Sequence, residues 1–447
     1  MPRNVVTAHC AVTTTRNDNY NFKIGIMATC YLGLGSNVGN KKKNILLAVK
    51  YLQKSKGIKV EKVSRLYESS PCGCPAGSPD FLNGAAKIRT SLAPLALLKE
   101  LKNIERCLGR KKAKRFFPRP IDIDILFYAN KKVNLPNLKI PHPRLKMRDF
   151  VLTPLKEISP GIIKKIASEV KTIKDIPSMR AFLAHARKNM SIGFVPTMGY
   201  LHDGHISLIR QAKKENDICV VSVFVNPLQF GPKEDFKKYP RDLERDSIKA
   251  QSAGCDVIFV PEERQMYPDS YCTYVNVDKL TGTLCGASRP GHFKGVATVV
   301  CKLFNIIQPD VAYFGQKDYQ QALVIKAMAK DLNMPLKISI MPTVREADGL
   351  AMSSRNSYLN LSERAEAAVL YQSLQQARKN IFSGEKSSKA IIGDIRKAIL
   401  KKKSAKIDYI AVADADTLES RDSVHGKALI ALAAWFGKTR LIDNILL

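Results

Sequence analysis

The sequence predicts two mixed helix-and-strand parts, an α+β part followed by an α/β part with a small α+β lid. The chain has 447 residues, which is more than one ordinary domain holds. Its first third alternates strand and helix patterns in the order βαββαβ, the ferredoxin-like arrangement. Its remainder holds short, continuous apolar strands separated by helical stretches, which is typical of a parallel sheet covered on both faces, as in a Rossmann-like domain.

The periodicity of the first part assigns each of its elements in turn. It predicts a strand over 28–37, a helix over Lys41–Lys54, strands over Ile58–Tyr67 and Leu82–Arg89, a helix over Leu95–Leu108 and a strand over Ile121–Phe127. Downstream, SIGFVP, ICVVSVFV and CDVIFVP are the apolar strands, and the final segment adds IDYIAVADA and KALIALAAWFG.

Changes of composition predict where the domains meet. The polar stretch KKIASEVKTIKDIPS separates the two parts, and Met27 directly precedes the first strand. We expect an extension over residues 1–27, a first domain over 28–163, a linker region over 164–178, a Rossmann-like domain over 168–355 and a lid over 356–447.

Composition excludes a membrane protein and favours the cytoplasm. The chain is 45% hydrophobic, yet no apolar run approaches the ~18 residues of a membrane span. Its ten cysteines are scattered. Only Cys72 and Cys74 are close, and C-x-C without a second ligand pair is a weak metal signal. Unpaired cysteines fit a reducing compartment.

The charge of the chain is concentrated in its first part. The net charge is +32, and residues 1–165 hold 32 Lys and Arg against 10 Asp and Glu. Such an excess suits either nucleic acid or polyanionic small molecules such as ATP. Aromatic residues make up only 7%, and no helix-turn-helix, zinc finger or RNA-stacking motif is present. We therefore expect no specific nucleic-acid binding.

The motif PTMGYLHDGH marks a candidate nucleotide site in the second part. His202 and His205 follow an apolar strand and stand at the start of a helix predicted over Ile206–Lys214. Their spacing puts both imidazoles on one side of the first turn, where free N–H groups favour phosphate. A lone H-x-x-H is more often a structural or zinc-binding pair, but Gly199 and Gly204 supply the context of a phosphate loop.

Other polar residues of the second part follow apolar strands. Lys317 in FGQKD suits a phosphate at the carboxyl edge of a sheet, and the MSSR stretch brings two hydroxyls and a guanidinium. Asn226, Gln229 and Gln321 could read hydroxyl and carboxylate groups, although each one singly could equally be a satisfied core amide.

In this order, these motifs resemble the pantothenate synthetase family, a group of adenylate-forming nucleotidyltransferases with a Rossmann-like fold. ASRPGHF and LIDN extend the resemblance over residues 168–447. It implies that pantoate attacks the α-phosphate of ATP to form pantoyl adenylate, that β-alanine then displaces AMP, and that the chain forms a homodimer through this part.

The resemblance also implies roles for particular residues. Gln229, Gln321 and Asn226 would bind pantoate; His205 would be the acid, with His202 and Lys317 assisting catalysis. The implied ATP-binding residues are Met198, Gly199, Tyr200, Leu201, His202, Asp203, Gly204, His205, Gly315, Gln316, Lys317, Asp318, Val344, Met352, Ser353, Ser354 and Arg355.

A second candidate site lies in the first part, in FFPRPIDIDIL. Asp122 and Asp124 alternate with isoleucines, so in a strand both carboxylates share one face. Two converging carboxylates commonly hold Mg²⁺ on ATP phosphates, although D-x-D alone is as often an exposed acidic face. The cations around them favour a triphosphate clamp: Arg110, Lys112, Arg115, Arg119, His142, Lys146 and Arg148.

Residues 28–162 resemble the 6-hydroxymethyl-7,8-dihydropterin pyrophosphokinase family through YLGLGSN, PDFLN, RPIDIDIL and a PH…K.R.F pattern. The implied reaction moves the β,γ-diphosphate of ATP to the pterin hydroxymethyl group, with Mg²⁺ on Asp122 and Asp124. The resemblance assigns catalysis and phosphate clamping to Arg110, Arg119, His142 and Arg148, the nucleotide side to Glu105 and Ile125, and the pterin pocket to Ser69, Ser70, Cys72, Phe81, Asn83 and Phe150. The family's W-G-P-R loop reads Phe116-Phe117-Pro118-Arg119 here.

The leading interpretation is a bifunctional cytoplasmic enzyme that uses ATP and Mg²⁺, with pantoate, β-alanine and the hydroxymethyl-dihydropterin as substrates. One alternative keeps the second activity and makes the first part a folded but inactive tether. Another is a basic RNA-binding protein related to aminoacyl-tRNA synthetases, which share the H-x-G-H motif.

Overall fold

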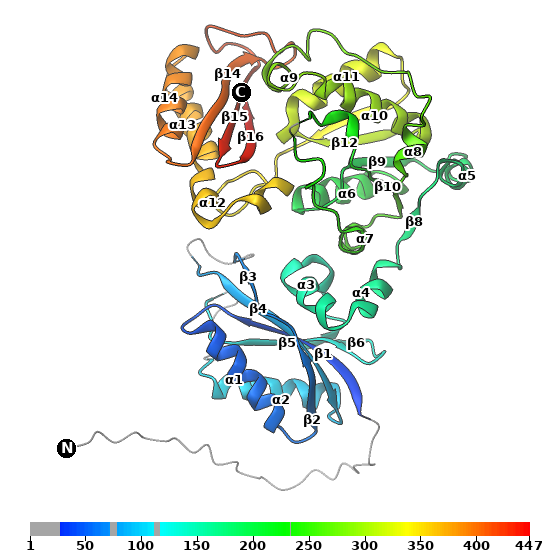
Figure 1. Cartoon of the computed structure of the whole chain (residues 1–447), viewed down its shortest axis with the longest axis vertical. Coiled ribbons are helices and arrows are strands. Elements are labelled where there is room, and N and C mark those ends of the chain that lie inside the picture. Colours follow the sequence, from blue (N-terminus) through cyan, green and yellow to red (C-terminus); the bar gives the residue numbers. More distant parts are fainter. Residues whose placement is uncertain (1–26, 72–77, 111–116, 233) are drawn as a thin grey trace, which may run out of the picture.

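A computed structural model describes residues 27–71, 78–110, 117–232 and 234–447 (Figure 1). Residues 1–26 of the expected extension lie outside the described residues, as do Cys72, Lys112, Arg115 and Phe116. Among those that are described, no helix has the length and apolarity to cross a membrane. Mixed helices and strands form both parts, and each part contains more than one cluster of buried apolar side chains.

The first part has the βαββαβ order that the sequence predicts. Its elements are β1 (Ala28–Ser36), α1 (Lys41–Lys54), β2 (Ile58–Val63), β3 (Tyr67–Ser69), β4 (Phe81–Thr90), α2 (Pro94–Cys107), β5 (Asp122–Tyr128), β6 (Val133–Leu135), β7 (Leu138–Ile140), the 3₁₀ turn η1 (Leu145–Met147), α3 (Asp149–Ile158) and α4 (Pro160–Ala167). The main sheet is antiparallel in the order β2-β4-β1-β5, and β3 extends the pairing on β4. The single strand expected over Ile58–Tyr67 is therefore interrupted after Val63.

Helices cover both faces of this sheet (Figure 1). Leu52 of α1 and Leu101 of α2 are fully buried in a core that also contains Leu32 of β1. On the other face, Leu155 of α3 packs in a cluster that contains Leu126 of β5. Helices α3 and α4 were not predicted from the sequence, and they form the surface that meets the second part.

The second part begins on a six-stranded parallel sheet in the order β13-β12-β9-β10-β11-β8, which fits a Rossmann-like domain. Its elements are β8 (Lys171–Ile173), α5 (Ile176–Ala186), β9 (Ile192–Thr197), α6 (Asp203–Glu215), β10 (Ile218–Val223), η2 (Pro227–Gln229), α7 (Leu243–Ser252), β11 (Val257–Phe259), α8 (Glu263–Met266), α9 (Leu284–Ser288), α10 (His292–Ile307), β12 (Val311–Gly315), η3 (Gln316–Asp318), α11 (Tyr319–Asp331) and β13 (Lys337–Met341).

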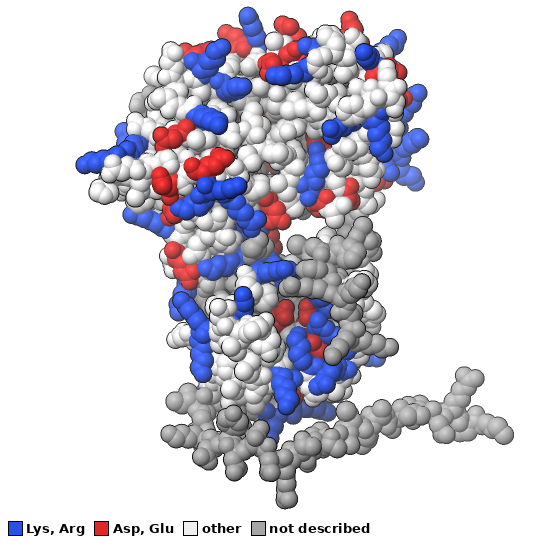
Figure 2. Space-filling view, turned by 180° about the vertical axis from the view of Figure 1, so that it is seen from behind, with Lys and Arg blue, Asp and Glu red and all other residues white. Residues whose placement is uncertain are grey.

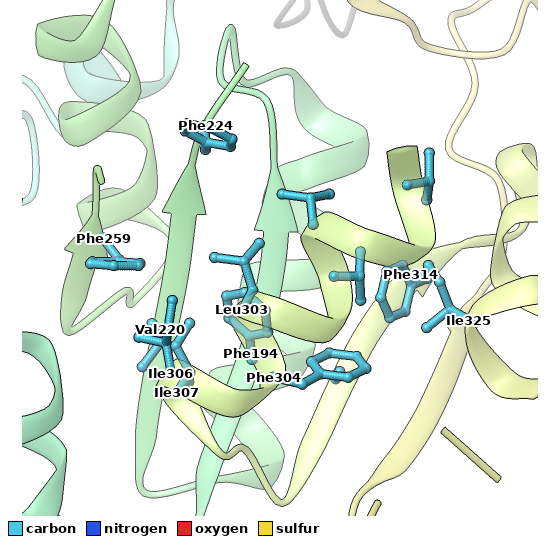
Figure 3. Close-up of a cluster of buried hydrophobic side chains, with 14 of the residues drawn as sticks. Phe194, Val220, Phe224, Phe259, Leu303, Phe304, Ile306, Ile307, Phe314 and Ile325 are labelled. Atoms are coloured by element: carbon cyan, nitrogen blue, oxygen red, sulfur yellow. The ribbon is translucent and has the colours of Figure 1, made fainter. Parts of the chain in front are cut away.

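Apolar side chains fill both faces of the parallel sheet. On one face, Phe194 of β9 meets Phe304 of α10 edge to face at 6.3 Å between ring centres (Figure 3). On the other, Ile209 of α6 packs with Val221 of β10. This two-sided burial explains why the strands read as continuous apolar runs.

The stretch expected as a linker region, residues 164–178, contains regular secondary structure. Residues up to Ala167 finish α4, Lys171–Ile173 form edge strand β8 paired with β11, and α5 starts at Ile176. An edge strand leaves polar side chains in water, and Lys171 and Thr172 are exposed. The stretch therefore looks like a loop in sequence although it completes the sheet.

The chain ends in an α+β unit whose three-stranded antiparallel sheet follows the order β14-β15-β16. Its elements are η4 (Ser354–Tyr358), α12 (Leu361–Ala367), α13 (Val369–Phe382), α14 (Ser388–Leu400), β14 (Ala405–Asp414), β15 (Ala428–Phe436) and β16 (Thr439–Leu446). Arg345 ties this unit to the preceding segment, because its guanidinium donates to both oxygens of Asp443 at 2.6 and 2.9 Å.

Candidate active sites

The first candidate site is a cavity of about 210 Å³ above the loop that joins β9 to α6. The helix begins at Asp203, three residues earlier than predicted, so His202 is its N-cap residue. Gly199 (φ +82°) and Tyr200 (φ +51°) turn the chain between strand and helix. A Cβ on Gly199 would lie 3.0 Å from the Asp246 carboxylate, so this close approach favours glycine.

Both loop histidines use the same ring nitrogen, Nδ1, to accept a backbone N–H group. Nδ1 of His202 accepts from the backbone N–H of Gly204 at 3.2 Å, and Nδ1 of His205 accepts from the N–H of His202 at 3.3 Å. The proton of each neutral ring is therefore on Nε2. The rings lie 4.1 Å apart and both line the cavity, so two N–H donors converge there beside the start of the helix.

Burial keeps these histidines neutral near pH 7. It lowers the pKa of His205 to about 4, with Asp318 and Lys317 acting on it in opposite directions. It lowers the pKa of His202 too, and the neighbouring His205 and Lys317 act in the same direction. His292, on the opposite wall, also has its pKa lowered to about 4 by burial and by Arg289.

These shifts predict that stability falls on mild acidification. Between pH 6.5 and pH 4 the unfolded chain binds protons that the folded histidines do not, so the free energy of unfolding decreases as the pH falls. Each such histidine contributes at most about 1.4 kcal/mol per pH unit. Urea unfolding at several pH values should show a flatter profile for the double variant His205→Gln, His292→Gln. The exposed His185→Gln is the control, and an unchanged slope in the double variant would contradict the assignment.

Cationic side chains approach the cavity from the other strand ends and from the lid boundary. Lys317 follows β12, and its Nζ lies 3.2 Å from Asp318. The backbone carbonyl of Lys317 accepts from Asn444 of β16 at 2.9 Å, so the C-terminal unit holds this turn. Arg355 donates to both oxygens of Asp235, at 3.1 and 2.8 Å. Ser354 donates to the backbone carbonyl of Tyr200.

The three amides singled out in the sequence differ in what they can bind. Asn226 is 1% exposed and all its hydrogen bonds are internal: it donates to Gln229 and to the carbonyl of Gly295, and accepts from Tyr267. Its amide is therefore satisfied by the protein and orients Gln229, and Asn226 also lines the cavity. Gln229 and Gln321 line the cavity.

Two further residues, Arg289 and His292, line the cavity although the sequence motifs assigned them no role. Arg289 donates to both oxygens of Glu234 at 2.7 and 2.6 Å and lies 3.0 Å from Nε2 of His292. His292 in turn donates from Nδ1 to the carbonyl of Gln229 at 2.8 Å. Both line the cavity opposite the helix α6, as does Tyr239. They lie in the ASRPGHF stretch, which carried the resemblance but was given no role.

The cavity does not contain every residue that was expected in it. The predicted residues along its lining are Met198, His202, His205, Asn226, Gln229, Gly315, Lys317, Asp318, Gln321, Ser353, Ser354 and Arg355. The others lie behind or beside them: Gly199, Tyr200, Leu201, Asp203, Gly204, Gln316, Val344 and Met352. Leu201 in particular is fully buried in the core.

The second candidate site lies across β1, β4 and β5 in the first part, in a cavity of about 70 Å³. Asp122 and Asp124 share one face of β5, while Ile123 and Ile125 are buried on the other, as the alternation predicts. Asp122 lies 2.5 Å from Arg110 and 2.9 Å from Arg119. Asp124 has a looser contact, 4.0 Å from Nε2 of His142.

The two carboxylates therefore differ electrostatically. Burial alone would raise the pKa of Asp122, but the charges of Arg119 and Arg110 outweigh it and hold that pKa below its usual range. Burial and the neighbouring carboxylate of Asp122 raise the pKa of Asp124. Asp124 is the carboxylate with the weaker cationic contact, and Arg119 Nε is buried without a hydrogen-bond partner among the residues that the structure describes. Both features leave room for a charged ligand.

Aromatic and polar side chains form the rest of this cavity. Arg119 lies 5.7 Å from the ring centre of Phe81, and Arg148 lies 5.3 Å from that of Phe150. Asn83 donates to the hydroxyl of Ser69 at 2.8 Å. The predicted residues along the lining are Ser69, Ser70, Phe81, Asn83, Arg119, Asp122, Asp124, His142, Arg148 and Phe150.

Four described residues expected at this site do not line the cavity: Glu105, Ile125, Lys146 and Arg110. Glu105 is 2% exposed and holds β5, because it accepts from the N–H of Ile123 at 2.8 Å and pairs with Arg110 at 2.7 Å. The side chain of Ile125 belongs to the core. Lys146 reaches into the second part and pairs with Glu169. Burial explains the first two, which sequence alone could not assign.

Two family models match the chain in succession. One, described as 7,8-dihydro-6-hydroxymethylpterin-pyrophosphokinase (HPPK), matches residues 31–160, and the other, described as pantoate-beta-alanine ligase, matches residues 171–446. The boundary between the matches falls between α4 and β8, where the two candidate sites are also divided.

Similar proteins cover the second part almost completely. The pantothenate synthetase of Moorella thermoacetica is 54% identical over 279 residues, which is 62% of this chain and 99% of that protein. That of Pelotomaculum thermopropionicum is 56% identical over 61% of this chain and 97% of its own length. A crystal structure of the Thermus thermophilus pantothenate synthetase matches with a TM-score of 0.59 at 45% identity, covering 62% and 99%. A Francisella tularensis pantoate-beta-alanine ligase, solved with β,γ-ATP and β-alanine, gives 0.53 at 38%, covering 62% and 97%.

Proposed function

Because the chain belongs to the pantoate-beta-alanine ligase family through residues 171–446, we propose that its second part joins pantoate and β-alanine with ATP. One observation carries the proposal most directly. Two N–H donors, from His202 and His205, face one cavity together with Lys317 and Arg289. An anionic substrate bearing phosphates suits such a lining.

The reaction we propose has two steps. A carboxylate oxygen of pantoate attacks the α-phosphorus of ATP, the bond to the leaving diphosphate breaks, and pantoyl adenylate forms. The amine of β-alanine then attacks the acyl carbon, and AMP leaves. Charge accumulates on the α-phosphate oxygens during the first step, so preorganised donors aimed at them accelerate it.

We assign His205 the role of a hydrogen-bond donor in that step. Its pKa, lowered to about 4 by burial, leaves the ring neutral near pH 7, and a neutral ring donates through Nε2–H without giving up its proton. This replaces the acid role that the sequence resemblance implies. His202 donates in the same way, Lys317 binds the outer phosphates, and Gln229 and Gln321 read the pantoate hydroxyl and carboxylate groups.

We also propose that the first part transfers diphosphate from ATP to the hydroxymethyl group of a dihydropterin. Asp122 and Asp124 present hard oxygen ligands on one strand face beside Arg119, His142 and Arg148. The HPPK family match over residues 31–160 supports this assignment. Phe81 and Phe150 supply flat apolar faces for a pterin ring, and Asn83 an amide for its edge.

The donor set fits Mg²⁺. The described residues contain no group of three or more His, Cys, Asp and Glu side chains that could hold a metal by themselves. Magnesium at phosphate sites usually takes one or two carboxylates and completes its shell with phosphate oxygens and water. Bound to Asp122 and Asp124, it would neutralise charge on the transferred phosphates. The arginines and His142 orient those phosphates from the protein side.

Two assays on one purified protein test both halves of the proposal. The first measures pantoate-dependent exchange between ATP and pyrophosphate, followed by pantothenate formation with β-alanine. The second measures AMP release that depends on the hydroxymethyl-dihydropterin and Mg²⁺. Absence of the first reaction contradicts the ligase assignment. Absence of the second alone leaves the first part as an inactive tether.

The basic surface is expected to bind nucleic acid only weakly. Figure 2 shows Lys and Arg side chains spread over both parts, interrupted by acidic and uncharged residues. With only 7% aromatic residues and no RNA-stacking motif in the sequence, binding should stay near the ~10⁻⁴–10⁻⁶ M of non-specific contacts at physiological salt and weaken steeply as salt rises. A salt series of RNA titrations checks this. Sub-micromolar, sequence-selective binding would favour the RNA-binding alternative.

A further inference from the structure

A carboxylate of the first part, that of Asp149, accepts hydrogen bonds from two cations of the second part. Asp149, the first residue of α3, accepts a two-pronged hydrogen bond from Arg245 of α7, with Nε to Oδ1 at 2.8 Å and Nη2 to Oδ2 at 2.9 Å. Lys249, one turn further along α7, donates to the same Oδ2 at 2.8 Å. Two cations thus share one carboxylate across the boundary between the two parts. Such fork-shaped pairs fix geometry as well as contribute energy.

Both cations, Arg245 and Lys249, also contact the loop that leads to His202 and His205. Lys249, whose side chain is 6% exposed, also donates to the backbone carbonyl of Leu201 at 3.0 Å. The guanidinium of Arg245 stacks 4.3 Å from the ring centre of Tyr200. Tyr200 and Leu201 lie directly before His202, so both contacts end within two residues of a cavity-lining imidazole.

A third residue of α7, Asp246, also binds this loop. The buried Asp246 accepts from the backbone N–H groups of Tyr200 and Leu201, each at 2.7 Å. Arg245 pairs with Asp246 at 3.3 Å as well. One turn of α7 therefore holds two N–H groups, one carbonyl and one ring of the loop, and its two cations are themselves anchored by Asp149.

We propose that Asp149 is a positioning residue for the ATP-binding loop of residues 199–202, so that the ligase site includes a carboxylate contributed by the first part of the chain. The inference rests on the ligase function proposed above. Without Asp149, Lys249 loses its paired carboxylate, and Arg245 keeps only its ion pair with Asp246. Lys249 is buried, so it would turn toward solvent or toward Asp246 and release the carbonyl of Leu201. The imidazoles would then be held less well at the position that ATP requires.

The boundary offers a matched control. Lys156 of α3 also bridges the two parts, through Asp242 at 3.3 Å and Glu244 at 3.1 Å. Both partners lie at the start of α7, and neither makes a recorded bond to the loop of residues 199–202. Removing Lys156 therefore weakens the contact between the parts without touching the residues that hold the loop.

The test compares Asp149→Ala, Asp149→Glu and Lys156→Ala in the full-length chain. Asp149→Ala should raise the KM for ATP in pantoate-dependent exchange by about two- to thirtyfold, with a smaller change in kcat. Asp149→Glu, which can still reach both cations, should restore most of the loss, and Lys156→Ala should behave like the wild type. Equal KM values for Asp149→Ala and Lys156→Ala would overturn the inference.

Hydrogen exchange at the loop separates this inference from the ligase function. The amides of Tyr200 and Leu201 should exchange faster in Asp149→Ala than in the wild type or Lys156→Ala, whether or not the protein turns over. Unchanged exchange in Asp149→Ala overturns the positioning role. A wild type without pantoate-dependent exchange would overturn the proposed ligase function instead, and the amide measurement would still decide the inference.

Discussion

Replacing Asp124 by Asn should abolish the release of AMP that depends on the hydroxymethyl-dihydropterin. Asp124 and Asp122 share one face of β5, and Asp122 is already paired with Arg110 and Arg119. Asp124 is thus the carboxylate most available to a cation on the ATP phosphates. Loss of that cation removes several kcal/mol of transition-state stabilisation, or a rate decrease of about a thousandfold or more. Initial rates of AMP formation at saturating Mg²⁺ measure the effect.

The same protein supplies the controls for this variant. Its ligase reaction should be unchanged, because the cavity of the second part is lined by residues from Pro196 onward. Asp80→Asn alters an exposed aspartate just before β4 and should keep near-normal AMP release. Asp122→Ala should also lose the activity, with some loss of stability because it leaves Arg110 and Arg119 without their shared partner. A pterin-dependent rate in Asp124→Asn within tenfold of the wild type would remove the metal pair from the mechanism.

Local patterns were enough to predict the strand that carries Asp122 and Asp124 and the helix start that carries His202 and His205. The alternation in IDIDIL fixes which side chains share a face because the period of a strand is two, and β5 places Asp122 and Asp124 as expected. The H-x-x-H spacing likewise places two rings on one turn of α6. In both cases the chemistry and the secondary structure are encoded within ten residues.

The roles of residues that act through tertiary contacts could not be predicted from the sequence. Glu105 has the residue type of a ligand, but its carboxylate is used to hold the backbone of β5 and Arg110. Asn226 has the type of a substrate reader and is satisfied internally. Conversely, His292 enters the site only because α10 brings it against the carbonyl of Gln229. The burial of a single polar side chain and its pairing with residues far away in the sequence have no local sequence signal.

The packing of the two parts on each other could not be predicted for the same reason. Helices α3 and α4 cover one face of the first sheet and also pack on α7, where Ile248 joins the cluster of Leu152, Leu155 and Ile166 (Figure 1). A polar stretch such as residues 164–178 suggests a flexible connection when it is viewed alone. In the structure the polar residues of this stretch lie on an edge strand and at helix ends. The contact between the two parts is made by the apolar residues of α3, α4 and α7 instead.

His205→Ala should remove most of the pantoate-dependent exchange between ATP and pyrophosphate while pterin-dependent AMP release continues. Nδ1 of His205 is occupied by the N–H of His202, so the ring has a single tautomer that points Nε2–H into the cavity. Loss of one preorganised donor to a developing phosphate charge costs about 10²–10³ in rate. His205→Gln keeps an N–H donor and should lose less, whereas the exposed His185→Ala should be indistinguishable from the wild type. Because the donor acts as a neutral ring, the exchange rate of the wild type should stay nearly constant from pH 7 to pH 8. A rate in His205→Ala within a few-fold of the wild type would place the catalytic donor on another residue of the cavity.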